Sequence, residues 1–83
     1  MMRVFYSKTS LKQLKKIPKT KQIEILKKIG KLKNNPVAGR KLKGLLMNYR
    51  SLKSWPYRII YQYFDSENVI KINIIQHRQA VYK

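Results

Sequence analysis

Apolar and polar residues follow a helical period in the first half of the chain. Residues 3–6 are rich in β-formers and predict a short first strand. A short helix should follow, capped by Ser7 or Thr9, and Pro18 either ends this helix or lies in the first turn of the next one. The apolar positions of the short helix recur at three-residue spacing, at Leu11, Leu14 and Ile17.

A longer helix is predicted over residues 20–33, where lysines surround an apolar stripe. Ile25 lies at the margin of this stripe, and an Asn-Asn-Pro sequence at residues 34–36 ends the helix. The two helices form a hairpin in this interpretation, and a flexible, positively charged loop follows over residues 37–47. The stripe consists of Ile23, Leu26, Ile29 and Leu32.

The second half of the chain changes to a period of two, with β-branched and aromatic residues throughout. It predicts three strands at residues 49–53, 57–64 and 69–77, joined by a turn at 54–56 and a four-residue loop at 65–68. The predicted fold is an α+β domain: an N-terminal strand, a two-helix hairpin and then a three-stranded antiparallel meander, with both helices packed on one face of the sheet.

The four-residue loop sets the register of the last two strands, because it places Phe64 opposite Val69 and Arg58 opposite Ile75. One face then suits the helices and the other is polar. On the polar face Arg58 and His77 are diagonal neighbours, about 7 Å apart at the backbone and within side-chain reach of one ligand. The register also pairs Gln62 with Lys71 and Ile60 with Asn73, assigns Ile59, Tyr61, Tyr63, Ile70, Ile72 and Ile74 to the apolar face, and leaves Arg58, Gln62, Lys71, Asn73 and His77 on the polar face.

Composition excludes several kinds of chemistry. The 83 residues contain 20 Lys and Arg, three acidic residues, one His and no Cys, and a chain of this length forms a single domain over residues 1–83. Disulfides and zinc thiolates are excluded. The acidic residues are too few to bind a magnesium pair or to form a glycosidase carboxylate pair, so we expect no metal and no cofactor, and chemistry that depends on Arg, Lys, His and Tyr. These acidic residues are Glu24, Asp65 and Glu67.

The positive charge predicts a polyanionic partner. A formal charge of +17 attracts nucleic acid or an acidic protein, and less readily an anionic membrane surface. Residues 1–6 lack the apolar core of a signal peptide, and no stretch approaches the ~18 apolar residues that span a bilayer. A soluble cytoplasmic protein is therefore expected.

Several segments follow one another in a characteristic order along the whole chain. They are the helical hairpin, Asn35-Pro36, residues 41–44, residues 49–53, residues 57–61 and residues 77–82. This succession resembles the RelE/ParE toxin superfamily. A Tyr-Arg-Ile-Ile-Tyr strand followed by a terminal His-Arg and Tyr is more similar to its RNA-cleaving RelE branch than to its gyrase-poisoning ParE branch. The resemblance implies an mRNA interferase of a toxin–antitoxin pair, which cuts messenger RNA in the A site of the 70S ribosome and is silenced by an antitoxin encoded beside it.

The resemblance also implies roles for individual residues. Arg58 matches the family's strand arginine that contacts the scissile phosphate, and Tyr82 matches a C-terminal tyrosine that stacks on a base or joins proton transfer. Arg50 and Lys53 fall near a basic pair on the preceding strand. The chain departs from some members in lacking a mid-sheet glutamate as general base and in lacking a C-terminal helix. Two further positions match a late-strand His or Arg of other members, namely His77 and Arg78.

Cleavage of RNA without a metal requires a base for the 2′-OH, a cation for the charge of the transition state and an acid for the leaving 5′-oxygen. Arg58 suits the cation role because a guanidinium can hold two phosphate oxygens. His77 is the expected proton-transfer residue, with Tyr82 or a lysine as its counterpart, and the product is a 2′,3′-cyclic phosphate. The residues expected to bind the RNA backbone or stack on a base are Lys41, Lys43, Arg50, Lys53 and Trp55.

Two other functions stay open from the sequence. One is a ParE-like inhibitor that binds DNA gyrase and cuts nothing, and the other is a non-catalytic basic module that binds RNA or the ribosome. Plainer interpretations also exist for His77 as an ordinary strand-end residue, Tyr82 as a frayed terminus and Trp55 as a surface anchor. For the interferase, the expected partners are messenger RNA, the ribosome and an acidic antitoxin, without a membrane.

Overall fold

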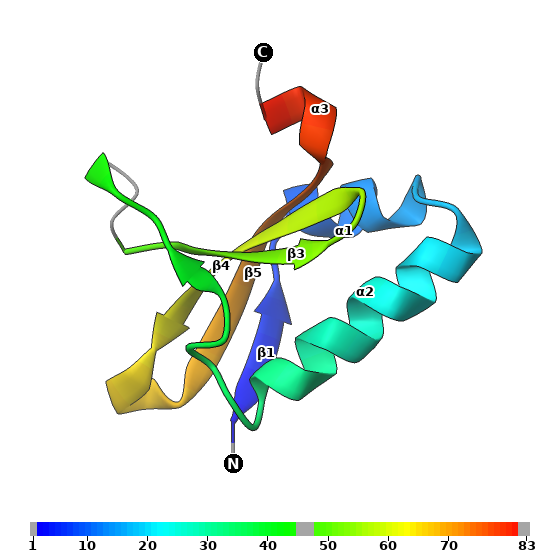
Figure 1. The fold of residues 1–83 in the computed structure, drawn as a ribbon. Helices are drawn as coiled ribbons and strands as arrows, with labels where there is room; N and C mark the ends of the chain where they lie inside the picture. Colours follow the sequence, from blue (N-terminus) through cyan, green and yellow to red (C-terminus); the bar gives the residue numbers. More distant parts are fainter. Residues whose placement is uncertain (1, 45–47, 82–83) are drawn as a thin grey trace.

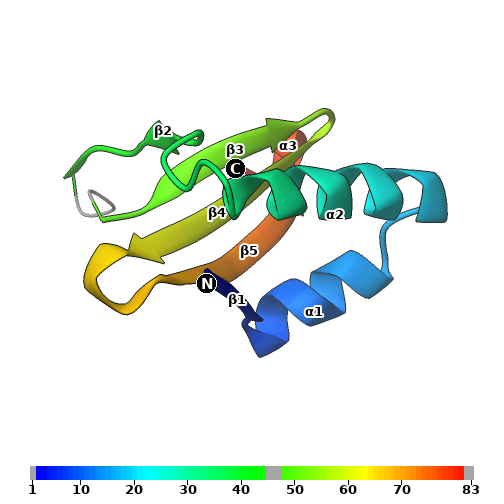
Figure 2. The ribbon, with the colours of Figure 1, turned by 90° about the horizontal axis from the view of Figure 1, so that it is seen from below.

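Five strands form one mixed sheet, and two helices lie along one of its faces (Figure 1 and Figure 2). The structure is a computed structural model that describes residues 2–44 and 48–81. The strand order is β1-β5-β4-β3-β2, with β1 parallel to β5 and the other neighbours antiparallel. The elements are β1 (Arg3–Tyr6), α1 (Lys8–Lys15), α2 (Lys19–Leu32), β2 (Arg40–Lys41), β3 (Arg50–Ser54), β4 (Tyr57–Phe64), the 3-10 turn η2 (Asp65–Glu67), β5 (Val69–His77) and α3 (Arg78–Val81).

The predicted α+β fold is confirmed, including the helical hairpin and the antiparallel meander. β4 and β5 coincide with the predicted strands, and β3 is displaced by one residue. The sheet contains one strand that was not predicted, the two-residue β2, which pairs with the start of β3. In the described part of the chain, no helix is long and apolar enough to cross a membrane.

Side chains at the N-cap and within α1 form hydrogen bonds with β5 beyond the point where β1 ends. Ser7 caps α1, because its Oγ accepts a hydrogen bond from the Ser10 amide at 3.0 Å. The same hydroxyl donates to the carbonyl of Asn73 at 2.7 Å, and the Gln13 side chain accepts from the amide of Ile75 at 2.7 Å. β5 thus finds hydrogen-bond partners beyond the last residue of β1.

The predicted apolar stripe of α2 is confirmed for Ile29 and Leu32 and is wrong for Ile23 and Leu26. Ile25, Ile29 and Leu32 form the buried face, whereas Ile23 and Leu26 are 47% and 43% exposed. An α-helix turns by about 100° per residue, so a constant spacing of three residues drifts around its axis. Across the span from Ile23 to Leu32 this drift places the two side chains on opposite faces, while spacings of four and then three keep one face.

The β4–β5 hairpin keeps the predicted register only near its loop. Gln62 pairs with Lys71 as predicted, but Ile60 pairs with Ile74 and not with Asn73. The register shifts between Ile60 and the next residue of β4, so that Asn73 is the extra residue of a β-bulge. The bulge reverses the predicted alternation of side chains over the rest of β5.

The consequence is visible in the burial of the two isoleucines after the bulge. Ile75 is buried in the core, and Ile74, assigned from the sequence to the apolar face, is only half-buried. Ile59 pairs with Ile75 and is also buried, so the core side of the sheet continues through this pair. The residues of β4 and β5 beside this pair project from the face that the helices leave uncovered.

Tyr61 connects the core to the loop that follows α2. Its ring is buried, and its hydroxyl donates to the Pro36 carbonyl at 2.7 Å and accepts from the Gly39 amide at 2.9 Å. Arg50 holds the same loop from β3, since its guanidinium donates to the carbonyl of Gly39 at 3.0 Å. The segment that leads into β2 is therefore fixed from two strands.

A short helix, α3, follows β5, so the expectation that the chain lacks a C-terminal helix is wrong. The amide of Arg78, its first residue, donates to the carbonyl of Pro56 at 2.8 Å. Pro56 belongs to the β3–β4 turn, where the Trp55–Pro56 peptide bond is cis. The start of α3 is thus attached to this turn (Figure 1).

Candidate active site

A hollow rich in lysine and arginine, here called the basic hollow, lies along β3 and reaches the uncovered face of the sheet. Lys53 pairs with Arg58 across β3 and β4, and both side chains project from that face because the neighbouring Leu52 and Ile59 form a core-side pair. The hollow has a volume of about 670 Å³, and none of the described residues that line it is acidic. Its lining consists of Ala38, Arg40, Lys41, Leu42, Lys43, Ser51, Leu52, Lys53 and Arg58.

A second, largely uncharged hollow adjoins the basic hollow on the same face. It has a volume of about 350 Å³ and shares Leu42, Ser51 and Arg58 with its neighbour. Arg58 is the only cation among the described residues that line it. The second hollow therefore offers a largely uncharged surface directly beside the Arg58 guanidinium. The other lining residues are Tyr49, Ile60, Asn73, Ile74 and Gln76.

A third hollow, of about 120 Å³, lies at the β3–β4 turn and is here called the tryptophan hollow. Trp55 is 64% exposed, and the guanidinium carbon of Arg78 lies 4.5 Å from the centroid of its ring. A cation at this distance over an aromatic face is attracted by the ring. The hollow is lined by Lys53, Trp55, Pro56, Tyr57, Arg58 and Arg78, so it shares Lys53 and Arg58 with the basic hollow.

Comparisons with known proteins show the family to which the chain belongs. A family model described as the ParE toxin of the type II toxin–antitoxin system, parDE, matches residues 4–82. The chain belongs to this family of toxins. A search of curated proteins found no match to the toxin.

Solved structures of related toxins share the fold over nearly their whole length. The RelBE2 complex from Mycobacterium tuberculosis is 24% identical with a TM-score of 0.85, covering 93% of this toxin and 98% of that chain. The archaeal RelE–RelB complex from Pyrococcus horikoshii is 27% identical with a TM-score of 0.79, covering 93% and 94%. The isolated RelE toxin from E. coli is 22% identical with a TM-score of 0.79, covering 99% and 97%.

The predicted pairing of Arg58 and His77 on one face of the toxin is wrong. Because of the bulge, Arg58 pairs with Gln76, while His77 pairs with Tyr57 and lies on the side of the sheet that the helices cover. The His77 ring packs edge to face on Tyr57 with 5.5 Å between centroids, and its Nδ1 accepts a hydrogen bond from the Gln79 amide at 3.2 Å. The imidazole is therefore not directed at a phosphate bound by Arg58.

The other predicted site residues of the toxin divide into two groups. Arg50 is not brought to the basic hollow, because its guanidinium is directed at the carbonyls of Val37 and Gly39 on the other side of β3. Tyr82 lies outside the described residues. Those that the structure gathers around the basic and tryptophan hollows are Lys41, Lys43, Lys53, Trp55, Arg58 and Arg78.

The toxin also has site residues that the sequence did not single out. Arg40 lines the basic hollow because the unpredicted β2 pairs it with Ser51. Gln76 stands opposite Arg58 because of the bulge, and a regular hairpin would have turned it to the core. Lys28 of α2 donates to the carbonyl of Lys53 at 2.7 Å and so fixes the edge of β3 beside the hollow.

The acidic residues of the toxin lie on α2 and in the β4–β5 loop. Glu24 forms an ion pair with Lys21 at 3.5 Å. Asp65 accepts a hydrogen bond from the Tyr63 hydroxyl at 2.8 Å, and this bond raises the pKa of Tyr63 above its usual value. Glu67 belongs to η2. The three hollows consequently present cations without a neutralising carboxylate among their described lining residues.

Proposed function

We propose that the toxin is a metal-independent endoribonuclease that cleaves messenger RNA at a phosphate held by Arg58. The observation that carries this proposal is the position of Arg58, which lines all three hollows. A guanidinium can bind two phosphate oxygens at once, and Lys53 stands beside it as a second cation. Room for backbone, sugar and base thus surrounds one phosphate-binding group.

The proposed reaction is attack of the 2′-oxygen on the adjacent phosphorus as the bond to the 5′-oxygen of the next nucleotide breaks. Arg58 stabilises the negative charge that builds up on the phosphate oxygens. Lys53, its cross-strand partner, donates a proton to the leaving 5′-oxygen. The family resemblance implies either base stacking or proton transfer for Tyr82, and we propose that Tyr82, as its phenolate, takes the proton of the 2′-OH. The products are a 2′,3′-cyclic phosphate and a 5′-hydroxyl.

The proposed partners follow from charge and from the family. A formal charge of +17 favours an acidic antitoxin as well as RNA. The M. tuberculosis and P. horikoshii relatives are complexes of toxin with antitoxin, and by analogy we propose an antitoxin that covers the basic hollow. The family resemblance, and not these complexes, leads us to propose that the RNA is cut in the ribosomal A site, in the cytoplasm.

Induced expression followed by mapping of messenger RNA ends tests this proposal. Wild-type toxin should generate new 5′-hydroxyl ends and upstream fragments that carry a cyclic phosphate. Arg58→Ala should lower the rate of cleavage by roughly 10²- to 10³-fold, the usual loss of one group that stabilises a transition state. Arg3→Ala on β1 removes the same charge far from the hollows and should cleave like wild type. Intact messenger RNA in cells arrested by wild-type toxin would refute the proposal.

Inhibition of DNA gyrase is a second candidate, favoured by the family model, whose description is that of ParE toxins. A gyrase inhibitor would arrest growth while messenger RNA stays whole. Purified toxin added to gyrase, ATP and relaxed plasmid would then block supercoiling. If the toxin binds RNA but neither cuts it nor inhibits gyrase, the third function considered above, a non-catalytic RNA-binding module, is the correct one.

A further inference from the structure

Trp55 has the largest apolar side chain of the toxin, yet this side chain is exposed and not packed in the core. It is the only tryptophan of the chain, it occupies a turn, and it is 64% exposed. The planar guanidinium of Arg78 lies 4.5 Å from its ring centroid. The two side chains come from different elements, the β3–β4 turn and the start of α3. The hydrogen bond from the Arg78 amide to Pro56 keeps these elements together.

The tryptophan hollow beside this pair extends to Arg58, the proposed phosphate-binding residue. Lys53 and Arg58 line both the tryptophan hollow and the basic hollow. An RNA strand whose phosphate is bound by Arg58 therefore has its neighbouring nucleotide close to Trp55. Single-stranded RNA is recognised mainly by stacking of unpaired bases on aromatic rings or on the guanidinium plane of arginine. The pair offers both kinds of surface at one place.

We propose that Trp55 and Arg78 form a stacking platform for the base next to the scissile phosphate, and that this platform sets the base preference of cleavage. The inference rests on the proposed ribonuclease function and deepens it. Arg78 is a positioning residue in this arrangement and does not act on the reacting atoms. An RNA occupant is favoured over a protein segment because a base fits an aromatic surface while its flanking phosphates meet Lys53 and Arg58.

Because Trp55 is the only tryptophan, its fluorescence reports directly on the platform. The first probe is a short single-stranded RNA with every 2′-hydroxyl methylated, which the toxin cannot cleave. The second probe is an abasic oligonucleotide of the same length, which offers phosphates without bases. We expect the first probe to quench Trp55 emission and the abasic probe to bind without comparable quenching. Equal quenching by both probes would overturn the inference.

Variants separate stacking from charge. Trp55→Ala should weaken binding of the methylated RNA by roughly tenfold or more and leave the affinity for the abasic probe unchanged, while Trp55→Phe should restore most of the loss. Arg78→Lys keeps the charge but loses the planar surface, so it should bind the methylated RNA as poorly as Arg78→Ala. If Arg78→Lys binds like wild type, charge alone explains Arg78 and the platform is refuted.

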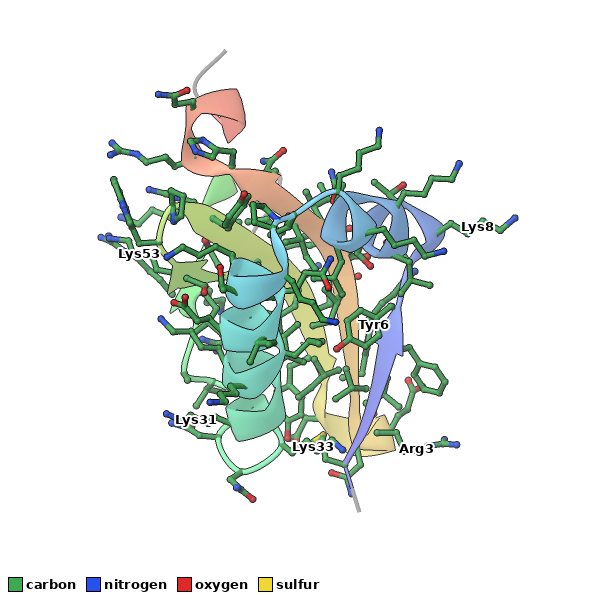
Figure 3. The ribbon with its side chains drawn as sticks, turned by 90° about the vertical axis from the view of Figure 1, so that its right-hand side faces the viewer. Arg3, Tyr6, Lys8, Lys31, Lys33 and Lys53 are labelled. Carbon is green, nitrogen blue, oxygen red and sulfur yellow. The ribbon has the colours of Figure 1, made fainter. Side chains whose placement is uncertain are left out.

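The toxin contains a matched control on the edge strand β1. Arg3 lies 5.6 Å from the centroid of Phe5 on β1, which forms a second exposed pair of arginine and aromatic ring. Figure 3 shows Arg3 and Lys53 on opposite sides of the molecule. Phe5→Ala should therefore leave the affinity for the methylated RNA and the affinity for the abasic probe unchanged. If Phe5→Ala and Trp55→Ala lower the affinity for the methylated RNA equally, base stacking is not specific to Trp55 and the inference is refuted.

Mapping of cleavage sites distinguishes failure of the platform from failure of the proposed function. If wild-type toxin cuts RNA, Trp55→Ala should still cut it but with an altered base frequency beside the cut. An unchanged base frequency refutes the platform and leaves the ribonuclease intact. If wild-type toxin cuts no RNA, the proposed function itself fails. A Trp55→Ala variant that loses antitoxin binding and keeps RNA affinity would assign the pair to the antitoxin and also refute the platform.

Discussion

Tyr61 lies against the loop that leads into β2, and this contact limits the side chain that fits at position 39. A Cβ on Gly39 would lie 2.6 Å from Cε1 and 2.6 Å from the hydroxyl oxygen of Tyr61, whose side chain is fully buried. Gly39→Ala should therefore lower the free energy of unfolding by about 1–3 kcal/mol, the usual cost of overpacking. Urea unfolding followed by circular dichroism measures the change.

Gly30 provides the control for this substitution. It lies within α2, and a Cβ added there meets nothing within 4 Å. Gly30→Ala should raise the free energy of unfolding by about 0.5–1 kcal/mol, because alanine is the better helix former. If both substitutions destabilise the protein equally, contact with Tyr61 does not explain the cost at position 39.

The hydroxyl of Tyr61 should make stability depend on alkaline pH. Burial raises the pKa of Tyr61 above its usual value of 10.0, an effect larger than the opposing ones of the Gly39 hydrogen bond and the Arg50 charge. The folded state thus prefers the neutral phenol, so its contribution to stability is complete below pH 10 and is lost as pH rises through the higher pKa of the folded state.

Tyr61→Phe tests the contribution of the hydroxyl's hydrogen bonds and its dependence on pH in one series of unfolding measurements. At neutral pH the variant should be about 1–3 kcal/mol less stable, because the Gly39 amide and the Pro36 carbonyl lose their hydroxyl partner. Above pH 10 the difference between wild type and variant should shrink. A difference that stays constant up to the alkaline limit would show that the Tyr61 hydroxyl does not titrate with unfolding.

The strands show what alternation of side chains can and cannot predict. β4 and β5 match their predicted limits, since long runs of β-branched and aromatic residues end at clear turn residues. The bulge at Asn73 was not predictable, because Ile74 and Ile75 are both apolar and either can face the core. A regular register and a bulged one therefore bury similar apolar area from the same sequence, and only packing against α1 and α2 distinguishes them.

The part of the candidate site that lies on β3 and β4 was predictable from the sequence, and the parts on β2 and at the end of β5 were not. Arg58 faces away from the core in both the predicted and the observed sheet, because its neighbour Ile59 is a core residue of a regularly alternating strand. Lys53 is its cross-strand partner. His77 was misplaced because it lies beyond the bulge. Arg40 was missed because a two-residue strand such as β2 carries no periodic pattern of its own.

The bulge also determines what the only histidine is expected to do. His77 packs on Tyr57 on the helix-covered side of the sheet, away from Arg58. His77→Ala should therefore keep RNA cleavage within a few-fold of wild type and lower the free energy of unfolding by about 0.5–1.5 kcal/mol through loss of the aromatic contact. Mapping of messenger RNA ends and urea unfolding measure the two effects. A cleavage loss as large as that of Arg58→Ala, with the fold intact, would restore His77 to the catalytic site.

The charge of the whole molecule raises the question of whether RNA binds to one place or to any lysine-rich surface. A chain of charge +17 attracts RNA everywhere, and α1 and α2 alone carry many exposed lysines. The basic hollow differs because five of its nine described lining residues are cations brought together from β2, β3, β4 and the segment after β2. If RNA binds in the basic hollow, its affinity should depend on these five cations. If RNA binds to the overall charge of the molecule, removing any single lysine or arginine should have a similar effect.

Salt dependence of RNA affinity separates these two cases. Each phosphate contact with single-stranded RNA contributes about 0.7 to the slope of log affinity against log salt concentration. Arg40→Ala and Lys43→Ala in the basic hollow should each reduce the slope by about this amount, measured with the methylated RNA. Lys12→Ala on α1 removes a charge that is also exposed but lies outside the hollow, and it should leave the slope unchanged. If Lys12→Ala lowers the slope as much as Arg40→Ala does, the RNA is bound by the overall charge of the molecule and the hollow has no special role in affinity.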